Sequence, residues 1–353
     1  MKTILVAPLN WGLGHASRDI PLIAALRAMG HRVVVASEGP ALALLRARFA
    51  GIEALSLPSY RVRYQAGRSQ LLSMLWVALR LPMHNLREHL WLRRVVRSYG
   101  IDFVLSDNRY GLWSRRCPCV HITHQLRVLP PPPMGWAGGL VALVLRRWLR
   151  RFDWVWVPDT IGPNAWAGQL SAYNGLSNLC YIGLLSRFTL PQPKAVVSAF
   201  EMVVVASGPP PHRQLLIDGA AAWARQHGLR CLIVEGNPAA GGCMRPDGEG
   251  VTLVGHLSDP EFAVAVRQAR YLLFRGGYSS IMDMLALGVS GLLVPTPGQT
   301  EQEYLAERLS TMGLFRMAPQ HQLAQLHPEQ LRVEHRCPLA NPALSQAIAA
   351  AIG

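Results

Sequence analysis

Runs of hydrophobic residues alternate between strand-like and helix-like spacing in the first 40 residues. Residues 3–8 form a short apolar run, and a glycine-rich turn follows it. Apolar side chains then recur with helical spacing over residues 19–29, and Gly30 is placed to end that helix. A second apolar run covers residues 32–37. A strand, a glycine turn, a helix and another strand make a βαβ unit, so the pattern predicts a parallel sheet.

The same pattern continues and then starts again in the second half of the chain. Further strands of the first series are predicted at residues 101–105, 119–123 and 153–158. The second series has predicted strands at 201–206, 230–235, 252–254, 271–274 and 291–295, with helices at 215–227, 260–268, 280–287 and 302–312. A chain of 353 residues is long enough for two such domains. We predict an α/β fold with one Rossmann-like domain over residues 1–188, another over residues 197–340, and a linker near residues 185–197.

The composition excludes a disordered chain and places the charge unevenly. Half of the residues are hydrophobic and 16% are charged. Residues 1–190 hold 23 Lys and Arg against 8 Asp and Glu, whereas the remainder holds 12 against 13. The net charge of +14 therefore lies in the first half. Such an asymmetry suggests an anionic partner, such as a phospholipid surface, a lipid phosphate or nucleic acid.

Cysteine usage and the apolar runs suggest the compartment. Six cysteines form neither a C-x-x-C pair nor a zinc-ligand spacing, which suits a reducing cytoplasm. The first apolar run is too short for a signal peptide, and the run at residues 135–145 is well short of the about 20 residues that span a membrane. We expect a cytoplasmic protein that is soluble or attached to the inner face of the cytoplasmic membrane.

The first loop with candidate chemistry is N-W-G-L-G-H-A-S-R, residues 10–18. Gly12 and Gly14 let the backbone turn tightly and approach a ligand ahead of a helix. His15 follows them, and a neutral imidazole there can take a proton from an acceptor hydroxyl. The alternative is that His15 caps the helix or contacts a phosphate. We favour the role in catalysis or substrate contact, with Gly12 and Gly14 on the acceptor side.

Two further polar groups follow strands of the same predicted sheet. Asp107 stands at the end of the strand at residues 101–105, where it can hold the tautomer of His15 and stabilise its imidazolium form. Asp107 followed by Asn108 is equally typical of a helix cap or a turn. His124, after the strand at residues 119–123, is a weaker candidate for the acceptor side.

The most specific motif covers residues 274–306. A strand ends in Gly276-Gly277, so backbone N–H groups and a helix dipole can bind a phosphate there. Asp283 lies in the first turns of the following helix, where it can accept hydrogen bonds from ribose hydroxyls. The next strand ends in a Pro/Gly turn that carries Glu301-Gln302, a carboxylate and an amide suited to sugar hydroxyls.

This segment resembles the donor-binding segment of GT-B glycosyltransferases. It is similar to that of the N-acetylglucosaminyltransferase that forms lipid II and to those of the UDP-glycosyltransferases. The resemblance implies two Rossmann-like domains whose parallel sheets face each other across a cleft, and a C-terminal helix, residues 341–352, that packs back on the first domain. It also implies a set of donor-binding residues: Ser207, Gly208, His256, Leu257, Arg275, Gly276, Gly277, Ser279, Ser280, Asp283, Glu301 and Gln302.

Within this set the resemblance assigns separate roles. Asp283 binds the ribose, and the pair Glu301-Gln302 binds the hexose. The diphosphate is bound by the glycines and serines of the turn, Gly276, Gly277, Ser279 and Ser280. Asp283 departs from the usual Glu of the family, and the late pair can also be aligned one residue on, at Gln302-Glu303. The family uses no bound metal and no cofactor, and attack by an activated hydroxyl gives inversion at the anomeric carbon.

The implied activity is transfer of a hexose or N-acetylhexosamine from a nucleotide-sugar, in the family a UDP-sugar, to a hydroxyl. The anionic partner suggested by the charge favours a lipid-linked or cell-envelope glycan as acceptor. Three rivals stay open. The G-x-G-H-x-x-R pattern of residues 12–18 is also similar to a nucleotide-sugar hydrolase of the pseudaminic acid pathway. An epimerase needs more acid/base carboxylates than these loops offer, and a non-catalytic relative would bind nucleotide-sugar or glycan only.

Two arginine-rich stretches can serve either the core or a membrane surface. Residues 69–97 and 140–152 mix Leu, Val and Trp with arginines. Cationic helices with Trp at the boundary can lie on an anionic membrane. The alternative is a pair of domain helices with apolar faces in the core and arginines in water. No nucleic-acid module is recognised, so we expect no nucleic-acid partner.

Overall fold

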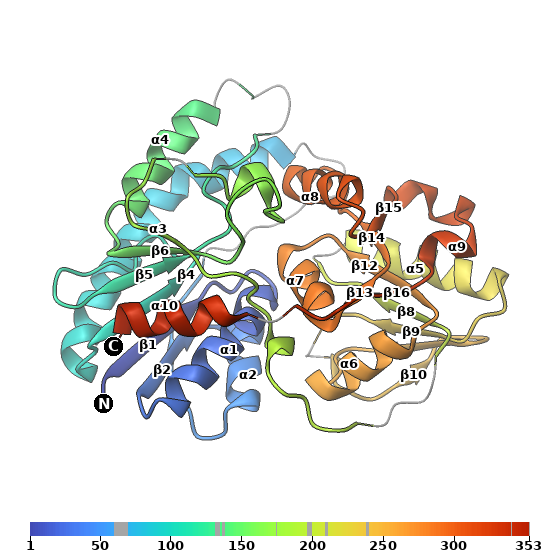
Figure 1. Cartoon of the computed structure of the whole chain (residues 1–353), viewed down its shortest axis with the longest axis horizontal. Coiled ribbons are helices and arrows are strands. Elements are labelled where there is room, and N and C mark those ends of the chain that lie inside the picture. The colour runs from blue at the N-terminus through green and yellow to red at the C-terminus, as the bar shows by residue number, and fades with distance from the viewer. Residues whose placement is uncertain are drawn as a thin grey trace. The chain divides into compact units, whose positions relative to one another are not determined.

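The structure is a computed structural model, and it divides into two compact units. It describes residues 1–59, 70–130, 135, 138–173, 175–195, 200–208, 211–237, 240–339 and 341–352, with no side chains for residues 70–79. The first unit is Met1–Ser186 with Asn341–Gly353, and the second is Arg187–Ala340. Both units are α/β, with a sheet and helices around it (Figure 1).

The first unit contains a seven-stranded sheet in the order β3-β2-β1-β4-β5-β6-β7, with all neighbouring strands parallel. Its strands are β1 Thr3–Pro8, β2 Arg32–Ser37, β3 Glu53–Ser56, β4 Phe103–Asp107, β5 Cys119–Ile122, β6 Trp154–Val157 and β7 Leu179–Tyr181. Its helices are α1 Gly14–Ala28, α2 Gly39–Arg48, α3 Gln70–Tyr99, α4 Gly138–Leu149 and α10 Pro342–Ile352, with a 3-10 turn at Gly168–Leu170. The strand order reverses between β1 and β4, which is the Rossmann switch point.

The second unit repeats this order in its own sheet, β10-β11-β9-β8-β12-β14-β15. Its strands are β8 Met202–Val205, β9 Cys231–Val234, β10 Arg245–Pro246, β11 Val251–Val254, β12 Tyr271–Arg275, β14 Leu292–Val294 and β15 Arg316–Met317, with β10 antiparallel. Its helices are α5 His212–Gln226, α6 Asp259–Gln268, α7 Tyr278–Leu287, α8 Thr300–Thr311 and α9 Pro328–Leu331, with 3-10 turns at Arg187–Thr189 and Gln320–Gln325. A small ladder pairs β13 Val289–Ser290 with β16 Glu334–His335. The switch point here lies between β8 and β12.

The strand cores follow from the apolar runs. Leu5, Val34 and Val104 lie on adjacent strands of the first sheet and are fully buried in one cluster. Val204, Ile233 and Leu273 lie on adjacent strands of the second sheet and are likewise buried in one cluster. A strand buried on both faces reads as a continuous apolar run, which is why these strands could be predicted.

One predicted boundary is wrong and matters for function. The helix expected from residue 19 begins at Gly14, so His15 lies in the first turn of α1 and not at the apex of a loop. Leu13 is the N-cap and makes no side-chain capping bond. Because neither a capping residue nor an acidic first turn marks this start, the usual sequence signals for a helix N-terminus are missing.

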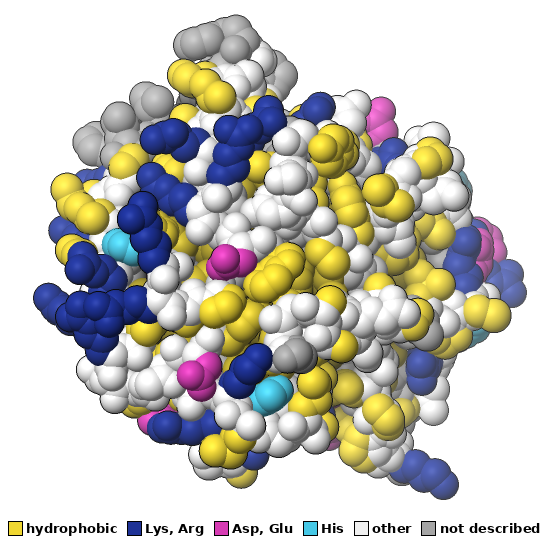
Figure 2. All heavy atoms as spheres, turned by 60° about the vertical axis from the view of Figure 1, so that its left-hand side comes forward, with side chains coloured by type: hydrophobic (Ala, Val, Ile, Leu, Met, Phe, Trp, Pro, Cys, Tyr) yellow, Lys and Arg dark blue, Asp and Glu magenta, His cyan; other side chains and the backbone are white. Residues whose placement is uncertain are grey.

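Arginines and large apolar side chains share the exposed faces of α3 and α4. On α3, Met83, Leu86 and Leu90 are exposed, and arginines follow towards its C-terminus. On α4, Leu140, Leu143 and Val144 are exposed, and arginines again follow. Figure 2 shows Lys and Arg side chains gathered among hydrophobic ones on the face turned to the viewer. Within the described residues, no helix is both long and apolar enough to cross a bilayer.

Candidate active site

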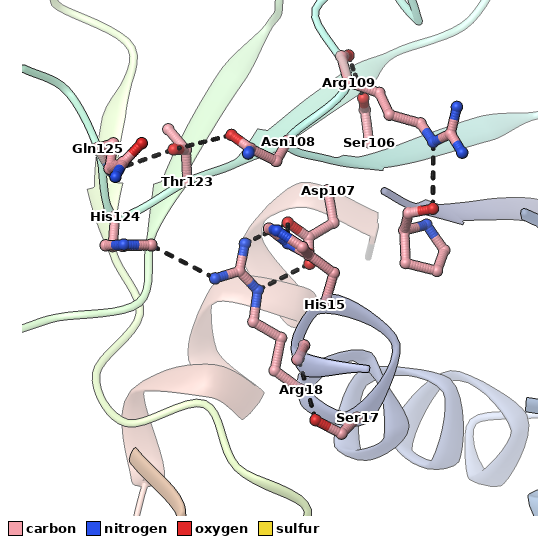
Figure 3. A network of polar contacts seen from close by, with 12 residues as sticks. His15, Ser17, Arg18, Ser106, Asp107, Asn108, Arg109, Thr123, His124 and Gln125 are labelled. Atoms are coloured by element: carbon pink, nitrogen blue, oxygen red, sulfur yellow. Dashed lines mark hydrogen bonds and ion pairs between the residues drawn. The ribbon is translucent and has the colours of Figure 1, made fainter. Parts of the chain in front are cut away.

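A buried polar network lies at the switch point of the first unit (Figure 3). Asp107 is the last residue of β4, and His15 follows β1 in the first turn of α1. The N–H of Leu9 donates to the carbonyl of Asp107 over 3.1 Å, which ties the ends of the two strands together. Gly12 forms the turn between β1 and α1 with φ +72°, a conformation that favours glycine. Parallel strands with adjacent C-terminal ends thus bring the two predicted residues together.

His15 and Asp107 form a direct hydrogen bond. Nδ1 of His15 lies 3.0 Å from Oδ1 of Asp107. An ionised carboxylate can only accept, so Nδ1 carries the proton and Nε2 is the basic nitrogen. The His15 side chain is 13% exposed and that of Asp107 is fully buried. The carboxylate of Asp107 is thus shielded from water and hydrogen-bonded to the imidazole of His15. This arrangement suits an acid that orients the base in a catalytic dyad.

Arg18, the last residue of the G-x-G-H-x-x-R pattern, contacts Asp107 directly, a role that the sequence pattern did not indicate. Its Nε donates to Oδ2 of Asp107 over 2.7 Å and its Nη2 donates to Oδ1, so the guanidinium grips both carboxylate oxygens. Its Nη1 lies 3.4 Å from Nδ1 of His124. Arg18 follows His15 by three residues on α1, which puts both side chains on one face of the helix. A helix predicted from Gly14 would have shown this spacing.

The local charges set the protonation of the network. Burial foremost lowers the pKa of His15; Asp107 opposes that shift and Arg18 adds to it. Burial alone would raise the pKa of Asp107, but Arg18 and His15 outweigh it and hold it well below its usual value. The resting network is thus a neutral imidazole beside a carboxylate that a buried guanidinium neutralises.

Two buried groups border this network. Asp19, on α1, has no hydrogen-bond partner for either carboxylate oxygen among the described residues, and burial followed by the charge of Asp107 raises its pKa well above the usual value. His121, on β5, is fully buried, and burial lowers its pKa to about 3. Burial thus disfavours the charged form of both side chains, and His121 is uncharged at neutral pH.

The second unit has an anion-binding geometry at its own switch point. β12 runs into Gly276 and Gly277, and Gly277 is the N-cap of α7. No side chain of the described residues caps this helix, and its first turn holds no acidic residue. A Cβ on Gly276 would lie 2.9 Å from Cδ2 of Leu293, whereas one on Gly277 would meet nothing within 4 Å. The Cβ position of Gly277 thus faces open space at the N-terminus of α7, where the helix dipole favours an anion such as phosphate.

Other predicted donor-side residues lie nearby in the topology. Ser207 and Gly208 follow β8, the strand beside β12, and Gly208 has φ +119° with open space at its Cβ position. Ser279 and Ser280 are partly exposed in the first turn of α7. These residues share the C-terminal edge of the sheet with Gly277.

The segment after β11 holds two more predicted donor-side residues. His256 is half-buried, and burial followed by the charge of Arg187 lowers its pKa. Leu257, beside it, is buried. An uncharged imidazole next to an apolar side chain is compatible with a packing surface for a nucleobase.

Two predicted donor residues, Asp283 and Gln302, already have protein partners. Asp283 on α7 is 3.5 Å from Nε of Arg187, and the same guanidinium lies 2.9 Å from Asp259. Gln302 accepts a hydrogen bond from the N–H of Thr296 over 2.9 Å. Glu301 is partly exposed on α8. A ribose bound at Asp283 has to share its carboxylate with Arg187, which the sequence did not reveal.

Arg275 already has several contacts within the second unit. Its side chain is 1% exposed and donates to the carbonyls of Pro295 and His212 and to Oε1 of Gln320. Burial lowers its pKa to about 10, still far above neutral pH. These contacts tie loops of the unit together, and a role of Arg275 in donor binding stays a prediction.

Comparisons with known proteins agree with this architecture. No family model matches the chain. The uncharacterized glycosyltransferase MK0977 of Methanopyrus kandleri is 23% identical over 318 residues, 85% of this chain and 87% of MK0977. The spinosyn rhamnosyltransferase SpnG superposes with a TM-score of 0.62 at 19% identity, covering 94% of this chain and 90% of SpnG. The calicheamicin glycosyltransferase CalG4 superposes with a TM-score of 0.58 at 19% identity, covering 94% and 89%.

SpnG has also been solved with thymidine diphosphate and with the spinosyn aglycone. The homologue and these structural neighbours are glycosyltransferases. With two parallel-dominated sheets that match theirs, the chain has the fold of the GT-B glycosyltransferases.

Proposed function

We propose that this protein transfers a hexose or N-acetylhexosamine from a nucleotide-sugar to a hydroxyl group, with inversion and without a metal. The observation that carries the proposal is the hydrogen bond between His15 and Asp107 at the switch point of the first unit. Nε2 of His15 takes the proton of the acceptor hydroxyl, and Asp107 stabilises the imidazolium that forms. The acceptor oxygen bonds to the anomeric carbon as the bond to the diphosphate breaks, and the nucleoside diphosphate leaves.

The donor belongs to the second unit in this proposal, and the acceptor to the first. The N-terminus of α7, with Gly276, Gly277, Ser279 and Ser280, holds the diphosphate and stabilises its charge as it leaves. Asp283 accepts hydrogen bonds from the ribose hydroxyls, and Glu301 and Gln302 contact the transferred sugar. The thymidine diphosphate complex of SpnG supports a nucleotide-sugar donor. We propose UDP as the nucleotide, on the resemblance to the UDP-glycosyltransferases.

Replacing Gly277 by valine tests the phosphate site. A Cβ at this position would meet no atom within 4 Å and the φ of −70° suits any residue, so the fold is expected to persist. The same side chain fills the space in front of α7, so the Kd for UDP measured by calorimetry is expected to rise about tenfold or more, or 1.4 kcal/mol. Gly139→Val, at an equally open position in α4, is the control. An unchanged Kd for UDP in folded Gly277→Val would show that the phosphate does not bind at the N-terminus of α7.

Hydrolysis is the alternative favoured by the G-x-G-H-x-x-R pattern, because the same base can activate water. The two reactions are separated by incubating the protein with UDP- and dTDP-sugars and following products by mass spectrometry. The proposal expects intact donor until an acceptor is added, and a glycosylated product afterwards. Free sugar released at the same rate with and without acceptor would show a hydrolase. Donor that binds but is never consumed would show a binding protein.

We propose an acceptor that is linked to lipid, held at an anionic membrane by the exposed faces of α3 and α4. Trp113 joins these helices: it stacks on His89 of α3 at 4.1 Å and lies under the guanidinium of Arg151, just after α4, at 5.3 Å. Because Trp113 contacts both His89 and Arg151, the basic ends of both helices lie close together, and burial followed by the charges of Arg93 and Arg151 lowers the pKa of His89. Exposed leucines beside clustered arginines suit a bilayer interface.

Loss of two arginines at the C-terminal end of α4, Arg147 within it and Arg150 just after it, is expected to weaken vesicle binding. Arg147 and Arg150 are exposed, and each such charge contributes about 1 kcal/mol near an anionic surface, so Arg147→Gln with Arg150→Gln is expected to lower the affinity about 10-fold to 30-fold. Binding is measured by co-sedimentation with phosphatidylglycerol vesicles. The control removes two exposed arginines of the second unit, Arg230→Gln with Arg270→Gln. An equal loss of vesicle affinity in both double variants would show that only the net charge matters, and would contradict a membrane-binding role of α4.

A further inference from the structure

Arg18 sits in an unusual position for a guanidinium. Its side chain is 2% exposed, and its nitrogens contact Asp107 and His124. Among the described residues, the titratable and charged groups around the pair of His15 and Asp107 are Arg18 and Asp19 on α1, His121 on β5 and His124 just after it. Arg18 is the group among these whose positive charge is permanent, because an arginine side chain does not lose its proton in a protein.

We propose that Arg18 is a positioning residue for the base: it fixes Asp107 against His15 and balances the charge of that carboxylate, so that His15 rests in the neutral form that accepts a proton. This inference rests on the proposed role of His15. A carboxylate alone beside an imidazole favours the imidazolium form, which cannot act as a base. The guanidinium offsets this effect while leaving the carboxylate ionised and able to stabilise the imidazolium that forms during transfer.

The geometry argues for positioning over direct contact with a phosphate. The fork of Arg18 already holds both oxygens of Asp107, from Nε over 2.7 Å and from Nη2. Its third nitrogen, Nη1, faces Nδ1 of His124 at 3.4 Å. Because arginine only donates, Nδ1 of His124 is the acceptor, and that ring is oriented as well. A buried guanidinium with these contacts is not available to a leaving diphosphate.

The fork also explains why arginine and not lysine serves here. The planar guanidinium matches a carboxylate with two parallel hydrogen bonds, whereas an ammonium group is a point charge that cannot hold both oxygens in one orientation. Arg18→Lys therefore separates the two parts of the proposal: it keeps the charge and removes the fork. Arg18→Gln removes both.

The test is a histidine NMR titration that needs no turnover. The Cε1–Hε1 signal of His15 is assigned with His15→Gln, and its pKa is measured in each variant. In Arg18→Gln it is expected to rise by about 1 pH unit or more, the usual effect of one nearby charge. It is expected to stay near the wild-type value in Arg18→Lys. Arg27→Gln, the same loss of charge at an exposed position of α1, is the control and is expected to leave the signal unchanged.

Kinetics complete the test. In Arg18→Gln the acidic limb of kcat/KM is expected to move to higher pH with the NMR value, and in Arg18→Lys kcat is expected to fall with no movement of that limb. If Arg18→Gln does not fold, Arg18→Lys decides: a wild-type kcat overturns the positioning role. An unchanged His15 pKa in folded Arg18→Gln overturns the charge balance. A raised pKa in a protein that transfers no sugar leaves this inference standing and refutes the proposed function.

Discussion

Replacing His15 by alanine is expected to lower kcat for sugar transfer by about 10²-fold to 10⁴-fold, the usual contribution of a general base. Nε2 of His15 is the nitrogen that Asp107 leaves unprotonated, and the variant removes it. Donor binding belongs to the second unit in this account, so the Kd for UDP is expected to stay unchanged. Steady-state kinetics and calorimetry on the same preparations measure both quantities. His321→Ala, at an exposed position of the second unit, is the control.

The pH dependence of the wild-type enzyme belongs to the same prediction. Burial lowers the pKa of His15 below the ordinary 6.5, so the neutral base persists into mildly acidic solution. The rate is therefore expected to fall only when the pH drops below that ordinary value, and this limb is expected to vanish in His15→Ala. A variant that keeps more than about a tenth of the wild-type kcat would argue against His15 as the base.

The second large effect is expected from Asp107→Asn, on activity and stability together. An amide cannot neutralise Arg18, and a buried charge that loses its partner costs about 3–5 kcal/mol of unfolding free energy. An amide can also hold the ring of His15 in the wrong tautomer, so kcat is expected to fall about 10³-fold to 10⁴-fold, as in triads that lose their acid. Urea denaturation and kinetics measure the two losses. Asp102→Asn, an exposed residue that accepts one bond from the N–H of Thr3, is expected to cost less than about 1.5 kcal/mol.

The stability loss in Asp107→Asn has a predicted pH dependence. The pKa of Asp107 is held well below its usual value in the folded state. The stability that this carboxylate supplies is therefore complete above the ordinary carboxyl pKa of about 4 and is lost as the pH falls through the lowered value. The gap between wild type and variant should be widest at neutral pH and narrow below about pH 4. A gap that is the same at both ends of this range would mean that the charge of Asp107 does not stabilise the fold.

The sequence could predict that His15 and Asp107 lie together, because the ends of buried strands can be recognised in it. Apolar runs mark buried parallel strands, and the residues after them gather at one edge of a sheet. Arg18 was part of the G-x-G-H-x-x-R pattern but received no role, because the start of α1 carries no capping signal and nothing showed that His15 and Arg18 share a helix face. The three-residue spacing exists in the sequence, but it becomes informative only once the helix is known to begin at Gly14.

In the second unit, the sequence located the glycine turn but not the partners of its neighbours. Arg275 ends β12, and the strand end fixes where the residue lies without fixing the direction of its side chain. The structure turns it into the protein, onto carbonyls of remote loops. The ion pair between Arg187 and Asp283 joins residues almost a hundred positions apart, and no local pattern encodes such a contact.

In the proposed function, His15 drives acceptor-dependent transfer of a sugar from a nucleotide. The most direct measurement is nucleoside diphosphate release, followed by ³¹P NMR in wild type and His15→Ala. The donors are UDP- and dTDP-sugars, and the acceptors are 4-methylumbelliferone and a polyprenyl-diphosphate-linked N-acetylhexosamine. The account predicts release that starts when an acceptor is added to the wild type and is nearly lost in His15→Ala. Release at equal rates in both proteins, or equal rates with and without acceptor, would contradict it.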